Sequence, residues 1–160
     1  MEPVDVKKGT ILQNSGDLNS KVYHVVSGLL RSYSIDDKGK EHVFLFAPEG
    51  WTIADNNSKE MPCDLYIDVL EDSEVLVFEK DLERETKNVP ALIKRLSALQ
   101  KRVIMLKSAS AIERYEHFEN TYPEILQRVT QKMIASYLGI TPEALSKIKK
   151  ERITKKTSDS

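Results

Sequence analysis

Hydrophobic and polar residues alternate in short runs along the first eighty residues. The runs at 22–26, 29–35 and 41–47 are rich in β-branched and aromatic residues, and glycines or polar turns separate them. Alternation with a period of two is typical of half-buried strands, and such side chains favour a pleated surface. Several short strands at this spacing predict an antiparallel roll or sandwich.

The apolar period changes to about three and a half residues after position 80. Asp81 is expected to cap a short helix that ends at Thr86. Pro90 suits the first turn of a long helix, where its missing N–H is not needed. Apolar residues then recur at intervals of 4, 3, 4 and 3, the spacing of a coiled-coil seam. The seam residues are Leu92, Leu96, Leu99, Val103 and Leu106.

This seam has two interpretations. It can pack against the chain's own β-body, or it can join two copies of the chain. A strict seam is narrower than the stripe by which a helix usually faces a protein core, which favours association between copies. We therefore expect a homodimer. After the seam, residues 110–127 predict a short helix, a break before Pro123 and a second short helix.

The segment 131–151 predicts two helices joined by a tight turn. Gly139 supplies the left-handed conformation that ends the first helix, and Thr141 caps the second. Leu145 then docks the second helix on the first, and the small side chain of Ala135 lets the two helices cross closely. These features together are typical of a helix-turn-helix.

The outward face of the second helix is polar and mostly basic. In a DNA-binding module the start of such a helix enters the major groove, and later residues contact phosphates. Glu143 can accept a hydrogen bond from a cytosine amino group, and Lys147 can donate to guanine. The alternative is a helical hairpin with a solvated basic face. We favour duplex DNA, with the candidate contacts Gln131, Thr141, Pro142, Glu143, Ser146, Lys147, Lys149 and Lys150.

The net charge of −1 conceals an uneven distribution. From Arg128 onward there are eight Lys or Arg and three Asp or Glu, a balance of +5, so the preceding residues carry −6. A basic end on an acidic body indicates different partners for the two parts. The chain has 160 residues, one cysteine and no apolar run of membrane-spanning length. We expect a cytoplasmic protein that has no membrane partner and no internal disulfide.

A glycine-punctuated β-roll, a seam helix and a helix-turn-helix, in this order, resemble the CRP/FNR family of bacterial transcription regulators. The resemblance covers nearly the whole chain and is clearest in KKGTILQNSGDLNSKVYHVVSGLLRSYSIDDKGKEHVFLFAPEGW and QKMIASYLGITPEALSKIKK. ERYEHFENTYPEILQRV is similar to the linker of a subgroup without an obvious effector site.

The resemblance implies an α+β fold with three parts. These are a cyclic nucleotide-binding-like jelly roll (double-stranded β-helix) at 1–80, a dimerisation helix region at 81–110 and a helix-turn-helix domain at 111–160. It also implies a parallel two-fold dimer that binds inverted-repeat promoter DNA, with RNA polymerase as a further candidate partner.

The effector site departs from the family pattern. Members that bind cyclic nucleotides carry an arginine followed by serine or threonine about ten residues after a Gly-Glu pair. Here Cys63 and Asp64 fall at that place, and no arginine occurs between Arg31 and Arg84. An aspartate repels a bound phosphate. We expect no cofactor and no binding of cyclic AMP in the usual mode.

A different effector stays open, with Trp51, Cys63 and Asp64 as candidate pocket residues. The alternatives are that Trp51 packs in the wall of the roll and that Cys63 is an inert thiol. The chain also ends soon after the second helix, without room for the family's β-wing, and begins almost at the first strand. We therefore expect Lys155 and Lys156 to supply phosphate contacts.

Two other functions compete with DNA binding. One is a small-molecule sensor that uses the pocket of the roll. The other is a cupin-like metalloenzyme on the same roll, which needs clustered metal ligands. His24, His42 and His117 are scattered along the sequence, and no catalytic constellation is recognisable. We expect neither a metal site nor an enzyme.

Overall fold

The computed structural model describes residues 2–81 and 86–158, with side chains of the last helix described as far as Thr154. The predicted short helix that ends at Thr86 falls largely outside the described residues. The chain forms two compact units, Met1–Asn88 and Val89–Ser160. The first unit contains 18 Asp or Glu and 10 Lys or Arg, and the second contains 7 and 14. The first unit is therefore acidic and the second basic, and the basic unit begins well before Arg128.

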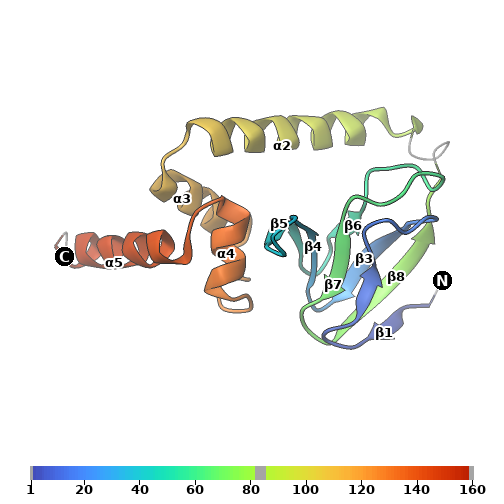
Figure 1. Cartoon of the computed structure of the whole chain (residues 1–160), viewed down its shortest axis with the longest axis horizontal. Coiled ribbons are helices and arrows are strands. Elements are labelled where there is room, and N and C mark those ends of the chain that lie inside the picture. Colours follow the sequence, from blue (N-terminus) through green and yellow to red (C-terminus); the bar gives the residue numbers. More distant parts are fainter. Residues whose placement is uncertain (1, 82–85, 159–160) are drawn as a thin grey trace. The chain divides into compact units, whose positions relative to one another are not determined.

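The first unit consists of two four-stranded antiparallel sheets (Figure 1). One sheet has the order β1-β8-β3-β6, and the other has the order β2-β7-β4-β5. The strands are β1 (Val4–Val6), β2 (Ile11–Gln13), β3 (Lys21–Ser27), β4 (Leu30–Ile35), β5 (Glu41–Ala47), β6 (Thr52–Ala54), β7 (Tyr66–Val69) and β8 (Ser73–Glu79). The prediction of a jelly roll is confirmed.

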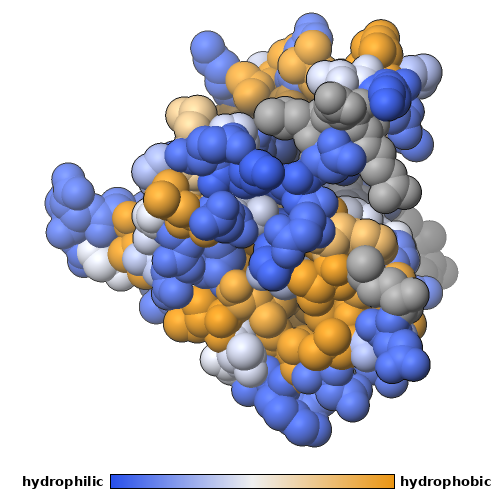
Figure 2. Space-filling model, turned by 90° about the vertical axis from the view of Figure 1, so that its right-hand side faces the viewer, coloured by the Kyte–Doolittle hydropathy of each residue, from blue (hydrophilic) through white to orange (hydrophobic). Residues whose placement is uncertain are grey.

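The core of the roll lies between the two sheets. Alternate residues of β3 point inward, so Tyr23 and Val25 are buried, and Leu30 of β4 and Ile67 of β7 meet them from the other sheet. Outside the core, Val22 of β3 lies opposite Phe78 of β8 in the antiparallel pair. On the face drawn in Figure 2, hydrophobic side chains form a patch below the centre, among hydrophilic ones.

Gly28 forms the turn between β3 and β4, and only glycine fits there. Its φ is +95°, in the left-handed region. A Cβ at this position would lie 2.1 Å from the Oγ of Ser73 and 2.8 Å from the backbone oxygen of Asp72. The close approach lets the Ser73 hydroxyl accept a hydrogen bond from the N–H of Leu29 at 3.1 Å. This turn therefore joins the two sheets tightly.

The second unit is helical. It contains α2 (Val89–Ser108), α3 (Ala111–Thr121), α4 (Gln131–Leu138) and α5 (Pro142–Ser158) (Figure 1). A capping box starts α3, since Ser110 accepts from the N–H of Glu113 and the Glu113 carboxylate accepts from the N–H of Ser110. None of the described helices is long and apolar enough to cross a bilayer.

The prediction of a second short helix after Pro123 is wrong. Consecutive turns follow α3 instead, with the N–H of Ile125 bonded to the oxygen of Tyr122 and the N–H of Arg128 bonded to the oxygen of Ile125. Ile125 and Tyr122 are buried. The segment therefore folds around two anchored side chains, and a helix is not needed to bury them.

Candidate nucleic-acid interface

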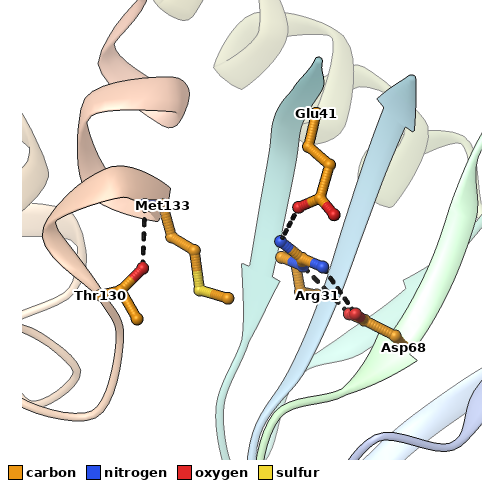
Figure 3. A network of polar contacts seen from close by, with 5 residues as sticks. All are labelled: Arg31, Glu41, Asp68, Thr130 and Met133. Atoms are coloured by element: carbon orange, nitrogen blue, oxygen red, sulfur yellow. Dashed lines mark hydrogen bonds and ion pairs between the residues drawn. The ribbon is translucent and has the colours of Figure 1, made fainter. Parts of the chain in front are cut away.

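The α4–α5 pair consists of two helices joined by a tight, capped turn. Thr130 begins α4, because its hydroxyl accepts a hydrogen bond from the N–H of Met133 at 3.2 Å (Figure 3). Gly139 ends α4 with φ +65° and ψ +33°. The Thr141 hydroxyl then accepts from the N–H of Ala144 at 3.2 Å and starts α5. Both predicted caps, Gly139 and Thr141, are present, and Thr130 is an additional cap.

The two helices pack against each other through apolar side chains. Leu145 and Ile148 of α5 are 0% and 6% exposed, and Ile134 and Leu138 of α4 are fully buried. Ala135 is 1% exposed, which agrees with a crossing that requires a small side chain. Apolar burial of this kind contributes about 1.5–3 kcal/mol for each large side chain. The pair is therefore a packed unit on which surface residues are held in place.

The predicted base-reading residues lie on the exposed side of α5. Thr141, Pro142, Glu143, Ser146 and Lys147 are all exposed to solvent, and so is Lys150. The side chain of Lys147 is 79% exposed, and its Nζ lies 3.9 Å from the nearest oxygen of Glu151. A charge pair of that distance and exposure is weak. The first two turns of α5 therefore present polar groups that a nucleic acid can reach.

Lys149 contacts the beginning of α4. Its Nζ donates to the Oε1 of Gln131 at 2.9 Å, which brings two predicted DNA contacts together. Lys132, which the sequence analysis did not single out, is exposed in the same first turn of α4. The first N–H groups of a helix have no partner within the helix and favour anions such as phosphate. The side chains of Lys155 and Lys156 lie outside the described residues.

Arg152 does not contribute to this surface. Its guanidinium forms an ion pair with Glu119 of α3 and lies 5.5 Å above the ring of Tyr115. The charge of this residue is therefore compensated inside the helical unit, where it fastens α5 to α3. The sequence count of basic residues could not distinguish such a structural arginine from a DNA contact.

The predicted seam on α2 is largely exposed in the part of the chain that the structure describes. None of the residues of α2 is buried. Leu96 and Val103 are 67% and 54% exposed, Leu92 and Leu99 are 39% and 37% exposed, and Leu106 is half-buried. Exposed apolar side chains in an ordered row are typical of an interaction surface.

The three candidate effector residues differ in burial. Trp51 is half-buried and packs against the core of the roll. Cys63 is 3% exposed, and burial raises the pKa of its thiol, so little reactive thiolate forms at neutral pH. Asp64 is exposed. None of the three lines the shallow depression that the structure shows beside β1 and β8, which is formed by Asp5, Val6, Lys7, Ser27, Asp72, Ser73 and Glu74.

The connection between β6 and β7 is organised by a buried carboxylate. Asp55 is 3% exposed and accepts hydrogen bonds from the N–H groups of Asn57, Asp64 and Leu65 at 2.8, 2.8 and 3.0 Å. Backbone N–H groups in such a loop are common donors to phosphate. In this loop the three N–H groups already donate to the carboxylate of Asp55.

Arg31 forms a second network that sequence reasoning missed. Its Nε and Nη2 donate to the two oxygens of Asp68 at 3.0 and 2.6 Å, and its Nη1 donates to Glu41 at 2.7 Å (Figure 3). Burial lowers the pKa of Arg31, but the two carboxylates outweigh burial and raise it. This arginine ties β4 to β5 and β7, and its charge is already compensated. Among the described residues, no group of three His, Cys, Asp or Glu side chains is placed to hold a metal ion.

Comparisons with known proteins agree with this architecture. A family model of the cyclic nucleotide-binding domain matches residues 3–85. The regulatory protein HlyX of Actinobacillus pleuropneumoniae is 25% identical over 165 residues, covering 89% of this chain and 68% of HlyX. HlyX is by its name a regulatory protein, in agreement with the expectation of a regulator.

Two solved structures share the fold over nearly the whole chain. FixK2 from Bradyrhizobium japonicum has a TM-score of 0.80 at 18% identity, and the match covers 97% of this chain and 86% of FixK2. A CRP/FNR-family transcriptional regulator from Thermus thermophilus has a TM-score of 0.78 at 17% identity, with 96% and 87% covered. The chain therefore belongs to the cyclic nucleotide-binding domain family, and it shares its fold with a CRP/FNR-family regulator of known structure.

Proposed function

We propose that the protein is a cytoplasmic, homodimeric regulator that binds specific inverted-repeat DNA. The observation that supports this most strongly is the capped α4–α5 pair with an exposed polar face at the start of α5. Two such helices in a two-fold dimer reach successive major grooves about 34 Å apart. Glu143 and Lys147 are the proposed base contacts, and Lys149 with Gln131 is the proposed phosphate contact. RNA polymerase stays a prediction from the family resemblance.

The proposed dimer forms along α2. Twenty residues make a helix about 30 Å long, and the seam runs along most of it. The sequence of α2 contains five basic residues and no acidic residue. Two such helices side by side repel each other, and salt screens repulsion between exposed charges. Dimer formation is therefore expected to strengthen with salt, whereas DNA binding weakens with salt.

The dimer proposal is tested by placing a charge on the seam. Leu96→Glu should leave a monomer in sedimentation equilibrium and lower affinity for an inverted repeat at least tenfold, since one half-site contact remains. Ser97→Glu adds the same acid one residue away, off the seam, and should leave both properties close to those of the natural chain. A Leu96→Glu chain that stays dimeric with unchanged affinity contradicts dimerisation through α2.

We further propose that the roll does not bind cyclic AMP in the family's usual mode. The carboxylate of Asp55 already accepts from the backbone donors of the loop. Cys63 stands where the resemblance places a phosphate-binding arginine, and Asp64 stands where it places the serine or threonine that follows. The carboxylates of Asp55 and Asp64 add negative charge at a place where a cyclic phosphate needs positive charge. Arg31 offers no substitute, because Asp68 and Glu41 already hold its guanidinium.

Calorimetric titration tests this second proposal. Cyclic AMP should release no binding heat at concentrations up to about 1 mM, a limit that corresponds to about −4 kcal/mol of binding free energy. It should also leave the affinity for DNA unchanged. Saturable binding that raises DNA affinity shows that the nucleotide is an effector after all.

A further inference from the structure

Arg114 lies at the junction of three helices. It belongs to the first turn of α3, and its guanidinium donates to three backbone oxygens of other segments. Nη2 donates to Leu106 in the last turn of α2 at 2.6 Å, Nε donates to Ala109 after α2 at 3.1 Å, and Nη1 donates to Leu138 at the end of α4 at 3.2 Å. One side chain thus joins the seam helix to the helix-turn-helix.

The three acceptors are groups that need a partner. The last carbonyl oxygens of a helix have no intrahelical donor and carry partial negative charge, so a cation at two helix ends is stabilised there. A guanidinium offers five N–H donors in a rigid plane, which suits several carbonyls around one point. A lysine carries a compact charge on a flexible stem and cannot hold the same three oxygens in fixed directions.

A second contact links the same elements. The guanidinium of Arg102, on α2, lies 4.1 Å above the ring of Tyr137, on α4. Tyr137 is 4% exposed and meets the rings of Phe118 and Tyr122 at 5.3 and 5.6 Å. Because only two residues separate the end of α2 from the start of α3, the connection is short, and these contacts leave α4 little freedom to turn relative to α2.

We propose that Arg114 is a positioning residue that fixes the orientation of the helix-turn-helix relative to the seam helix. The effect of this orientation on DNA binding rests on the proposed function. In a dimer joined along α2, the orientation of α4 sets how far apart and at what angle the two α5 helices are presented. Arg114 thereby determines the spacing of half-sites that the protein accepts, without touching DNA.

Binding to altered spacers tests the consequence. The natural chain should prefer one spacer by roughly tenfold over spacers longer or shorter by 1 and 2 base pairs, since each base pair turns a half-site by about 35°. Arg114→Gln should reduce this preference to threefold or less. Lys107→Gln removes a positive charge from the same end of α2 and should keep the preference. If Arg114→Gln weakens binding equally on every spacer, the residue only stabilises the fold and the inference is wrong.

A distance measurement tests the orientation without DNA. Spin labels are attached to two exposed positions, Lys101→Cys on α2 and Lys132→Cys on α4. Cys63→Ala removes the native cysteine, and dilution with unlabelled chains suppresses distances between the two copies of a dimer. Arg114→Gln should broaden the single narrow distance distribution, and Lys107→Gln should not. An unchanged narrow distribution in Arg114→Gln overturns the inference. If the natural chain binds no DNA, the proposed function fails, and the distances still decide whether Arg114 holds the helices.

Discussion

Replacing Lys147 by alanine separates base recognition from general attraction to DNA. Lys147 is exposed near the start of α5, and its contact with Glu151 at 3.9 Å is weak, so its loss should change the free energy of unfolding by less than about 0.5 kcal/mol. A lysine that donates to guanine contributes about 1–3 kcal/mol of discrimination at one base pair. This corresponds to roughly 5–150-fold in each half-site.

Lys149→Ala provides the matched comparison on the same helix. Lys149 lies against Gln131 at the start of α4, where we propose a phosphate contact. Its loss should weaken binding to every sequence by a similar factor and lower the slope of log affinity against log salt by about 1 per half-site. Lys147→Ala should instead bring the affinities of cognate and single-mismatch sites together.

Fluorescence anisotropy with labelled duplexes measures both effects. Each variant is titrated on the cognate site and on a site changed at one symmetric base pair, at several salt concentrations. The base-reading role of Lys147 is refuted if Lys147→Ala weakens both sites by the same factor. Loss of binding together with loss of helical circular dichroism shows instead that the substitution damages the fold.

Three further predictions concern the two units separately. Gly28→Ala should destabilise the roll by about 3 kcal/mol, because positive φ and the 2.1 Å approach to Ser73 combine. Gly139→Ala adds a Cβ no closer than 3.7 Å to a neighbour and should cost only about 1 kcal/mol of strain. Urea unfolding measures both costs, followed by Trp51 fluorescence for the roll and by helical circular dichroism for the second unit. Equal losses of stability in Gly28→Ala and Gly139→Ala refute this argument. Hydrogen bonds from the Ser110 hydroxyl and N–H lower the pKa of Glu113, so its stabilisation of α3 is present above the ordinary carboxyl pKa and is lost as pH falls through the lowered pKa. The urea midpoint of helix unfolding should therefore fall between pH 6 and pH 3, less steeply in Glu113→Gln, and equal slopes count against the capping box. Asp55→Asn should loosen the β6–β7 connection, because an amide oxygen replaces a carboxylate that accepts three N–H groups, and amide hydrogen exchange at Asp64 and Leu65 should accelerate at least tenfold.

Local features could be predicted from the sequence. Gly139 ends α4 and Thr141 starts α5 as expected, because a left-handed glycine and a hydroxyl cap act within a few residues. Strands β3, β4 and β5 were predictable for a similar reason, since alternation marks which side chains face a core, whereas the three-residue strands β1, β2 and β6 are too short to show an alternation. Thr130 was missed although a capping hydroxyl before an apolar run is also a local signal.

Long-range contacts could not be predicted in this way. Arg31 and Asp68 are 37 residues apart, and only strand register brings them together. Arg114 and Leu138 are 24 residues apart and meet because of the way the helices pack. The second helix after Pro123 failed as a prediction because apolar spacing alone does not distinguish a helix from consecutive turns that bury Ile125.

Selection from random duplex DNA tests the central proposal most directly. The protein is mixed with a pool of random duplexes, bound molecules are enriched, and the recovered pool is titrated at two salt concentrations. We predict an inverted repeat with half-sites about one helical turn apart and an affinity that falls steeply with salt. Recovery of no enriched sequence and no binding at either salt concentration contradicts the assignment of α4 and α5 as a DNA-binding surface.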